Sequence, residues 1–285
     1  MRALRPYLRL SRGARCGTSF LMTVPDMFSR VARRRFRDRA CKSAEDDRWL
    51  IRAMSEELLE RLDLSNITFV RALIIGNDGG HMAAALIKRA ILVMTADAGS
   101  AGARVQYGVQ CDEDRLPFAD HSFDLIIAIG TLDSVNDLPG ALTLIRRMLM
   151  PEGLFLAAMP GAGSLATLKS ALIDSADGLR HIVRHHPQID VRAAGDLLAR
   201  TGFQLPVADT LTITARYPDV FRLISDLRAN GFTNALLERF GLRRDRVAQI
   251  ANAFSNTAND KIEETFAIIF MTGWSPSKRS SLPST

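Results

Sequence analysis

Cysteine is scarce in this chain. The three cysteines, Cys16, Cys41 and Cys111, lie far apart in the sequence. A small secreted domain usually has an even number of closely spaced cysteines, and a zinc site has short Cys or His repeats. Neither pattern is present, so the sequence argues against a disulfide framework or a metal site and indicates a reducing compartment.

Long apolar runs are also absent. No uninterrupted run approaches the roughly 18 residues that a membrane-spanning helix needs. Of the 285 residues, 47% are hydrophobic and 24% are charged, which is ordinary for a chain that buries a core of its own. We therefore expect a soluble protein without a transmembrane segment. Peripheral association with a membrane stays open.

Acidic residues are rare in the first part of the chain. Residues 1–42 contain eleven Arg and one Lys against Asp26 and Asp38, a net charge of +10. The whole chain carries +6, so the remainder carries −4. The basic stretch 30–42 has only Phe36 as an aromatic residue and matches no nucleic-acid fold motif, which argues against RNA as a partner. We expect a helix here that covers a cleft or docks a partner.

Residues 1–22 contain no acidic residue, and four arginines share one helical face: Arg2, Arg5, Arg9 and Arg12. This pattern is typical of an organelle transit peptide. The alternative is that translation starts at Met22. Both interpretations predict disorder in residues 1–22. The first places the protein in the mitochondrial matrix, and the second is compatible with a bacterial cytoplasm.

The middle of the chain alternates between short apolar runs and amphipathic segments. A helix is expected at 43–62, with Ser43 as its N-cap. The expected strands and helices that follow are strands at 69–76, 91–97, 103–112, 123–132 and 153–161, and helices at 80–90, 136–150, 163–176 and 191–201. Apolar strands that alternate with helices predict a parallel sheet covered on both faces.

The end of the chain adds two strands, at 210–216 and 264–274, separated by helices within 217–259. The predicted fold is therefore a doubly wound, mostly parallel, seven-stranded α/β sheet with a helical insertion before the last strand. The expected organisation is a transit-like segment at 1–22, N-terminal helices or a lid at 23–64, the main domain at 65–275 and a disordered tail at 276–285.

A glycine-containing turn follows the first expected strand, in ALIIGNDGGHMAAALIKR (72–89). Gly76 ends the strand, and Asp97 ends the next one, where a ribose-binding carboxylate belongs. An Asp at that place is also a common strand terminator. The turn lacks the three spaced glycines that hold a pyrophosphate. Asp78 would repel a phosphate but suits an ammonium, as in S-adenosylmethionine, although Asn77 and Asp78 are also good turn formers.

The stretch CDEDRLPFADHSFDLIIAIGTLDSVNDLPGALTLIRRMLMPEGLFLAAMPG (111–161) strongly resembles the second half of a class I S-adenosylmethionine-dependent methyltransferase domain, whose fold is Rossmann-like. The resemblance implies that Asp112 meets the adenine of the cofactor. The family's usual acid within the first strand is replaced here by Ile74, and its His-Trp pair after the fourth strand by Asp133 and Ser134.

A narrower resemblance covers about residues 24–274. It rests on FSRVARRRFRDRA, PGAGSLATLKSAL, LLARTGFQLPVADTLTITARYPDVFRLISDLRANG and FAIIFMTGW. These segments resemble the methyltransferase-like assembly factors of respiratory complex I and their alphaproteobacterial relatives. The resemblance implies an enzyme that methylates or hydroxylates an arginine of a complex I subunit. A related branch methylates the carboxylate of malonyl-carrier protein.

These patterns lead to specific expectations for the site. The expected cofactor is S-adenosylmethionine, held by Gly76, Asn77, Asp78 and Gly80 at its methionine part, by Asp97 at the ribose, and by Asp112 and Glu113 at the adenine. No catalytic residue stands out, because methyl transfer needs mainly positioning. Asp133 is a weak candidate for a general base and is better explained as a helix-start acid.

Two further interpretations accompany this one. His181, His185 and His186 lack the accompanying ligands of a metal site and are expected to form a surface or loop cluster. A chain that had lost its cofactor would instead act as an assembly chaperone, with the helical insertion 217–259 as its binding surface. The expected partner is in either case a protein.

Overall fold

A computed structural model describes residues 26–105, 108–174, 185–238, 244–255 and 262–277. Within them seven strands form one sheet in the order β3-β2-β1-β4-β5-β7-β6. Neighbouring strands from β3 to β5 are parallel, and β7 is antiparallel to both β5 and β6. The predicted fold class is therefore confirmed. The strands are β1 (Arg71–Ile75), β2 (Leu92–Asp97), β3 (Val109–Gln110), β4 (Phe123–Ile129), β5 (Leu149–Pro160), β6 (Gln204–Tyr217) and β7 (Ile262–Trp274).

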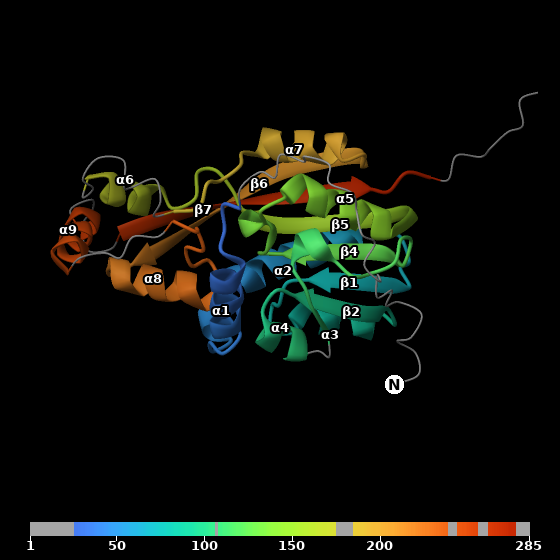
Figure 1. Ribbon diagram of the computed structural model, residues 1–285, viewed down its shortest axis with the longest axis horizontal. Helices are drawn as coiled ribbons and strands as arrows, with labels where there is room; N and C mark the ends of the chain where they lie inside the picture. The colour runs from blue at the N-terminus through green and yellow to red at the C-terminus, as the bar shows by residue number, and fades with distance from the viewer. Residues whose placement is uncertain (1–25, 106–107, 175–184, 239–243, 256–261, 278–285) are drawn as a thin grey trace, which may run out of the picture.

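Helices cover both faces of this sheet (Figure 1). The α-helices of the described residues are α1 (Arg30–Ala40), α2 (Trp49–Leu64), α3 (His81–Lys88), α4 (Ser100–Val105), α5 (Leu138–Met148), α6 (Ala166–Asp174), α7 (Val191–Arg200), α8 (Val220–Ala229) and α9 (Arg244–Ser255). Short 3-10 helices lie at η1 (Asp46–Arg48), η2 (Glu113–Arg115) and η3 (Leu132–Ser134). No described helix is long and apolar enough to span a membrane.

The core has two halves because successive strand residues point to opposite faces of the sheet. Ile74 of β1 packs in a buried cluster with Met54 of α2 and Met82 of α3. Its neighbour Ile75 packs in a second cluster with Ile145 of α5. This burial on both faces explains why the strands are apolar throughout rather than alternating.

The third predicted strand is the one substantial error in the fold prediction. Residues 103–112 were expected to be extended, but α4 occupies Ser100–Val105 and β3 contains only Val109 and Gln110. Asp38 explains the helix in part, since its carboxylate accepts a hydrogen bond from the Ala101 backbone N–H at 2.7 Å in the first turn of α4. This contact comes from a distant segment and leaves no local sequence signal.

The helix predicted at 43–62 begins later than expected. The chain turns at Ser43, forms η1 and enters α2 at Trp49, whose N-cap position is Arg48. Ser43 is therefore not the N-cap. Asn230 instead caps this helix from outside, because its side-chain oxygen accepts hydrogen bonds from the backbone N–H groups of Leu50 and Ile51, at 3.1 and 3.0 Å.

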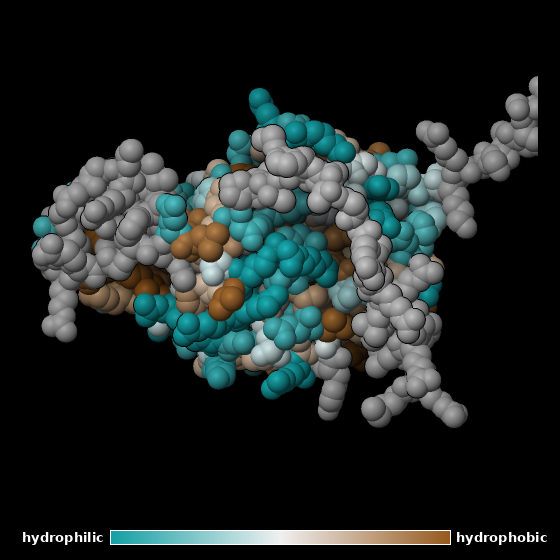
Figure 2. All heavy atoms as spheres, viewed as in Figure 1, coloured by the Kyte–Doolittle hydropathy of each residue, from teal (hydrophilic) through white to brown (hydrophobic). Residues whose placement is uncertain are grey.

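Two parts of the chain lie against the ends of the sheet. Helices α6, α8 and α9 gather around the long β6–β7 pair at one end of the molecule, and α1 crosses the carboxyl ends of β1 and β2 (Figure 1). In the same view hydrophilic residues cover the region of α1, and apolar residues show near α8 (Figure 2). Residues 1–22, with the transit-like segment, lie outside the described residues, as does most of the tail.

Candidate functional site

Three predicted cofactor-binding acids meet at the carboxyl edge of the sheet. Asp97 ends β2, and Asp112 and Glu113 follow β3. All three are almost fully buried, at 3%, 3% and 1% exposure. With the neighbouring Asp114 they form a cluster that we call the acidic rim. The sequence therefore predicted the position of this group, but it did not predict the partners that the group has in the structure.

Arg37 of α1 binds Asp97 directly. Its Nη2 donates to Oδ2 at 2.8 Å, and its Nε lies 3.1 Å from both carboxylate oxygens. The Gly99 backbone N–H donates to Oδ1 at 2.6 Å. Arg37 also donates from Nη1 to the carbonyl oxygen of Gly130, 3.1 Å away, at the end of β4. Both oxygens of the predicted ribose-binding carboxylate are thus occupied.

Arg33 binds Glu113 in the same way, one helical turn earlier. Nη1 and Nη2 donate to the two carboxylate oxygens at 2.5 and 2.8 Å, a bidentate pair. Nη2 also donates to the carbonyl and hydroxyl oxygens of Thr131, at 2.8 and 2.7 Å, and Nε donates to the Ser134 hydroxyl at 3.0 Å. This guanidinium therefore connects the acidic rim to the loop after β4.

The two remaining acids of the rim have their own arginines. Arg30 donates to both oxygens of Asp114, at 2.7 and 2.6 Å, and Arg34 donates to Oδ2 of Asp112 at 2.6 Å. Four arginines on one face of α1 thus neutralise the four carboxylates of the rim. This pairing accounts for part of the uneven charge of the chain, since the basic helix covers acids of the main domain.

The pKa values follow from these pairs. Burial by itself would lower the pKa of the Arg37 guanidinium, but the charge of Asp97 and the hydrogen bonds to it raise that pKa above the ordinary value. The pKa of Arg33 is raised by Glu113 against the same effect of burial. Burial raises the pKa of the Cys111 thiol to about 12, and the neighbouring carboxylates add to this shift. Cys111 is therefore a neutral thiol at pH 7.

The space beside the acids is nearly filled. The cavity between Arg37, Asn77 and Asp97 measures about 20 Å³, and the one beside Arg33 and Asp112 about 10 Å³. Cofactor pockets usually enclose about 300–1,000 Å³. The carboxylate acceptors of the rim nevertheless fit a nucleoside, because Oδ1 of Asp112 is buried and accepts no hydrogen bond from the described residues. The rim has the right acceptors, and α1 occupies the room.

The glycine turn has a tight geometry that depends on its glycines. Gly76 has φ of 98°, and a Cβ there would meet the Ile129 carbonyl oxygen at 2.4 Å and Nη2 of Arg37 at 3.3 Å. Arg37 therefore lies directly over the turn. Gly80 is the N-cap of α3 with φ of 95°. A side chain at either position would be strained.

Asn77 and Asp78 bind the turn itself. The Asn77 side-chain oxygen accepts the Gly79 N–H at 2.7 Å. The Asp78 carboxylate accepts the N–H groups of Gly80 and Met82, at 3.0 and 2.7 Å, and the Ser55 hydroxyl at 2.9 Å. This is the turn-forming role that the sequence left open. A contact between Asp78 and the ammonium of a cofactor stays a prediction.

A second cavity, of about 240 Å³, lies beside this turn. Arg48, Arg52, Gly79 and Gly80 are among its lining residues. The Nε of Arg48 is buried and has no hydrogen-bond acceptor among the described residues. A carboxylate would supply that acceptor. Neither arginine was singled out from the sequence.

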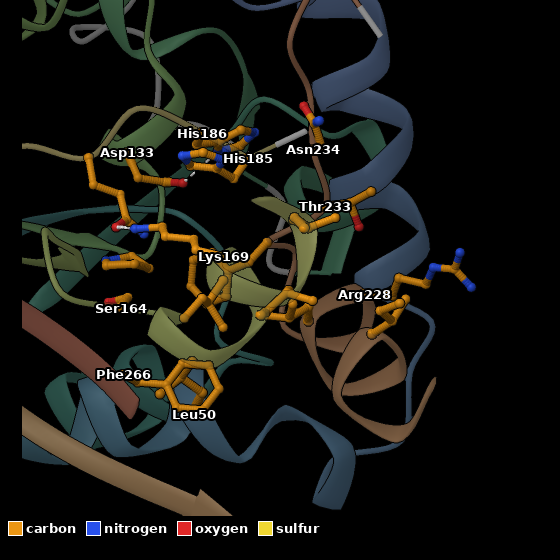
Figure 3. Close-up of a pocket in the computed structure, with 18 of the residues that line it drawn as sticks. Leu50, Asp133, Ser164, Lys169, His185, His186, Arg228, Thr233, Asn234 and Phe266 are labelled. Atoms are coloured by element: carbon orange, nitrogen blue, oxygen red, sulfur yellow. Dashed lines mark hydrogen bonds and ion pairs between the residues drawn. The ribbon is translucent and has the colours of Figure 1, made fainter. Parts of the chain in front are cut away.

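A third cavity, of about 320 Å³, lies at the carboxyl end of β5, whose last residue, Pro160, lines it. Figure 3 shows residues of its walls. Its walls are mostly apolar and come from α2, α6, α8, α9 and β7, including Leu50, Leu168 and Phe266. The Lys169 ammonium donates to the Gln188 side chain within it. Burial lowers the pKa of Lys169. The guanidinium of Arg228 points away from the cavity (Figure 3).

Asp133 lies at the edge of this cavity, in η3. Its Oδ2 is 3.2 Å from Nδ1 of His186, whose Nε2 accepts the Ala235 backbone N–H at 2.8 Å. Because Nε2 is an acceptor there, Nδ1 carries the proton and donates to Asp133. Asp133 lies in the first turn of η3 but does not cap α5, since Asp137 is the N-cap of that helix and its carboxylate binds the Gly140 N–H.

The predicted histidine cluster is divided. His186 lies in a loop as expected, but its side chain is only 13% exposed and is paired with Asp133, so a surface position is wrong for it. His185 also lines the cavity, and His181 lies outside the described residues. In the described part of the chain no three His, Cys, Asp or Glu side chains gather in a group that would hold a metal ion.

Sequence reasoning missed the arginines that bind the rim. Arg30, Arg33, Arg34 and Arg37 repeat at spacings of three, one and three, so they share one face of a helix. Arg35 and Arg39 lie on the exposed side of the same helix. This periodicity, together with four acids near the end of the second and third strands, was the signal that could have identified the pairs.

Comparisons with known proteins agree with this architecture. A family model described as a methyltransferase domain matches residues 75–157. The mitochondrial arginine hydroxylase NDUFAF5 of Danio rerio is 29% identical over 90% of this chain and 85% of its own length. The malonyl-[acyl-carrier protein] O-methyltransferase of Methylovorus is 32% identical over 88% of this chain and 90% of its own.

Solved structures show the same fold. A Bacillus halodurans protein assigned as a methyltransferase superposes with a TM-score of 0.57, at 14% identity, over 78% of this chain and all of its own. The chain is thus a class I methyltransferase-fold protein. It belongs to the family that contains the malonyl-[acyl-carrier protein] O-methyltransferases and is similar to the NDUFAF5 arginine hydroxylases. S-adenosylmethionine is the cofactor that this family membership indicates, as the sequence predicted.

Proposed function

We propose that this chain is an S-adenosylmethionine-dependent enzyme that modifies a side chain of another protein, such as an arginine of a respiratory complex I subunit. The observation that carries this proposal is the convergence of the Gly76 turn, Asp97 and Asp112 at the carboxyl edge of the sheet, where Asp133, which follows β4, lines a cavity of about 320 Å³. In doubly wound sheets this edge is where ligands bind.

Each part of the rim has a role in this proposal. Asp97 accepts the ribose hydroxyls, and Oδ1 of Asp112, which accepts no hydrogen bond from the described residues, accepts the adenine amino group. Arg48 holds the carboxylate of the methionine part beside Gly79 and Gly80, because its buried Nε needs an acceptor. S-adenosylmethionine bound by these residues would supply a methyl group to a nucleophilic atom of the acceptor.

The acceptor enters the large cavity beside Asp133. Asp133 follows β4 and Pro160 ends β5, and both line that cavity, so an acceptor in it would lie at the same edge of the sheet as the rim. Asp133 is held by His186, which fixes its carboxylate. Holding the two reactants in one orientation supplies most of the rate in such a transfer.

One observation favours a second candidate, the methylation of a carboxyl group on a carrier-protein acyl chain. The walls of the cavity are apolar, and the ammonium of Lys169 there is bonded to the neutral Gln188, not to a carboxylate. An apolar chain that ends in a carboxylate complements these features. The Methylovorus relative, which covers the chain almost completely, bears this activity in its name.

Mass spectrometry of candidate acceptors distinguishes these functions. Complex I subunits and acyl carrier proteins are isolated from cells with and without this protein. A mass difference of one methyl group or one oxygen on a subunit supports the first candidate, and a methyl difference on the carrier-bound acyl chain supports the second. Identical masses in both sets contradict an enzymatic role and favour an assembly chaperone. The Danio rerio relative is named as a mitochondrial protein. If the chain is eukaryotic, the candidate acceptors should therefore be isolated from mitochondria.

A further inference from the structure

The basic helix α1 occupies the positions that a nucleoside needs. The Arg37 guanidinium lies between the Gly76 turn and Asp97, and Arg33 fills the two oxygens of Glu113. The cavities left beside them, about 20 and 10 Å³, hold no more than a water molecule each. A cofactor and the arginines of α1 cannot occupy this edge together.

We propose that the guanidinium groups of α1 and the cofactor bind the same carboxylates of the acidic rim, and that only one of them can be bound at a time. The helix α1 must therefore leave the rim before S-adenosylmethionine binds. This inference rests on the proposed function. It makes α1 an autoinhibitory lid whose arginines stand in for the cofactor's hydrogen-bond donors. The ribose hydroxyls and the adenine amino group are also donors, which is why the same carboxylates accept either set.

The helix is held at the rim mainly by charge. Its buried residues are Ala32, Arg33 and Ala40, and its one aromatic residue, Phe36, is only partly buried against the cluster of Phe28, Ala235 and Leu236. Charged pairs lose a large part of their Coulomb energy to desolvation, whereas buried apolar area has no such opposing cost. The free energy that keeps α1 closed is therefore small for a helix with so many contacts, and a ligand for the same acids can replace it.

The start of α1 is attached separately and provides a pivot. Met27 and Phe28 donate their backbone N–H groups to the Asn136 side chain at 2.9 and 2.8 Å, and Asn136 donates back to the Phe28 carbonyl at 3.0 Å. Phe28 also forms a β-bridge with Leu236. These contacts do not involve the rim, so they persist when α1 lifts away from it.

Lifting α1 also changes the acceptor side. Arg33 bonds to Thr131 and Ser134, which lie on either side of Asp133. When the rim releases Arg33, the loop that carries Asp133 loses these three hydrogen bonds. Cofactor binding is thereby connected to the geometry of the acceptor cavity.

Titration calorimetry with S-adenosylhomocysteine tests the proposal. The proteins are the wild type, Arg37→Ala, the double variant Arg33→Ala/Arg37→Ala, and Arg35→Ala as a matched control that removes the same charge from the exposed face of α1. If about 90% of the molecules are in the closed form, opening it strengthens the apparent affinity by about tenfold. We expect that gain for the first two variants and none for the control.

Hydrogen exchange on the wild type tests the same point without a substitution. Addition of S-adenosylhomocysteine is expected to speed exchange of the α1 amides, because the helix leaves the rim. Slower exchange, or an Arg37→Ala affinity that is equal to or weaker than that of the wild type, overturns the proposal and makes α1 a clamp over the bound cofactor. The hydrogen-exchange result decides the matter if the variants do not fold.

The role of α1 and the proposed function are overturned by different results. If the wild type binds S-adenosylhomocysteine and Arg37→Ala binds it no better, only the autoinhibitory role of α1 is lost. If none of the four proteins binds it at millimolar concentration, the proposed function and the inference are both overturned, and the chain is a scaffold.

Discussion

Arg37 donates to both carboxylate oxygens of Asp97, and the two side chains are 10% and 3% exposed. This buried pair joins a helix near the start of the chain to the end of the second strand. Removal of one partner leaves the other as an uncompensated charge, which is the costly event in such pairs. The pair is therefore a test of how α1 contributes to stability.

Asp97→Asn is expected to lower the free energy of unfolding by about 3 kcal/mol, because it leaves Arg37 buried without a counter-charge. The double variant Arg37→Met/Asp97→Asn is expected to lose less than the sum of the single variants. Urea denaturation of the four proteins gives the coupling. Additive losses would show that the two side chains do not stabilise each other.

The acids of the site were predictable because each ends a strand or follows one. The alternation of strands and helices determines which ends of the strands meet, so the chain pattern was enough to expect Asp97 at this edge of the sheet. Gly76 was identified by the same reasoning. Asp112 was expected at the same edge from the resemblance to class I methyltransferases. What this reasoning cannot supply is the partner of each acid, which depends on how a separate helix docks.

Two failures have the same physical origin. The helix α4 is supported by Asp38, and α2 is capped by Asn230, about 180 residues away in the sequence. Both contacts come from other parts of the chain. Local propensity therefore predicted a strand at 103–112 where α4 lies, and Ser43 as the N-cap of the helix that in fact begins at Trp49. The arginines of α1 belong to this class of long-range contact as well, although their spacing gave a usable signal.

Gly76→Ala is expected to destabilise the protein by at least about 3 kcal/mol, the combined cost of a left-handed backbone and of overpacking. Its Cβ would lie 2.4 Å from the Ile129 carbonyl oxygen. Gly163→Ala is the matched control, because Gly163 has a similar φ of 96° but its Cβ would meet only the Ala267 Cβ, at 3.5 Å. Denaturant unfolding should show a loss of about 1–2 kcal/mol for the control. Equal losses would disprove the close approach of β4 to the turn.

Asp114 should give the protein part of its acid sensitivity. Burial would raise the pKa of this carboxyl, but the hydrogen bonds and charge of Arg30 more than offset that and hold the pKa below its ordinary value of 3.8. A lowered pKa in the folded state stabilises the fold above pH 3.8, and this contribution is lost as the pH falls further toward the folded-state pKa.

The corresponding measurement is the unfolding free energy from pH 6 down to pH 3. Asp114→Asn is expected to be less stable than the wild type at pH 6 and to lose less stability over the acid range. Asp120→Asn serves as the control, since its pair with Arg147 is half exposed and such pairs contribute little. If the unfolding free energy of Asp114→Asn falls as steeply between pH 6 and pH 3 as that of the wild type, Asp114 is not a source of the acid sensitivity.

Cys111 is expected to resist alkylation in the folded protein. Burial and the nearby carboxylates raise the pKa of its thiol to about 12, so almost no thiolate is present at pH 8. Iodoacetamide followed by peptide mass spectrometry should leave Cys111 unmodified in native buffer and label it fully in urea. Rapid labelling of the native protein would mean that the segment after β3 opens easily.

The charge of Lys169 distinguishes the two candidate acceptors. An acceptor that ends in a carboxylate is attracted by this ammonium in the largely apolar cavity, so Lys169→Glu is expected to lower kcat/KM for malonyl-carrier protein by at least about tenfold, or ~1.4 kcal/mol. An arginine-bearing acceptor carries a positive charge, so the same substitution should not impair its modification by electrostatics.

The control for this comparison is Lys88→Glu, which makes the same change of charge at an exposed position of α3. The affinity for S-adenosylhomocysteine should be unchanged in both variants, because Lys169 lies in the acceptor cavity and not at the rim. If the carrier-protein reaction is equally fast in the wild type and in Lys169→Glu, the acceptor does not bind in this cavity. A faster reaction of an arginine-bearing subunit would instead identify the cavity as the place where a guanidinium enters.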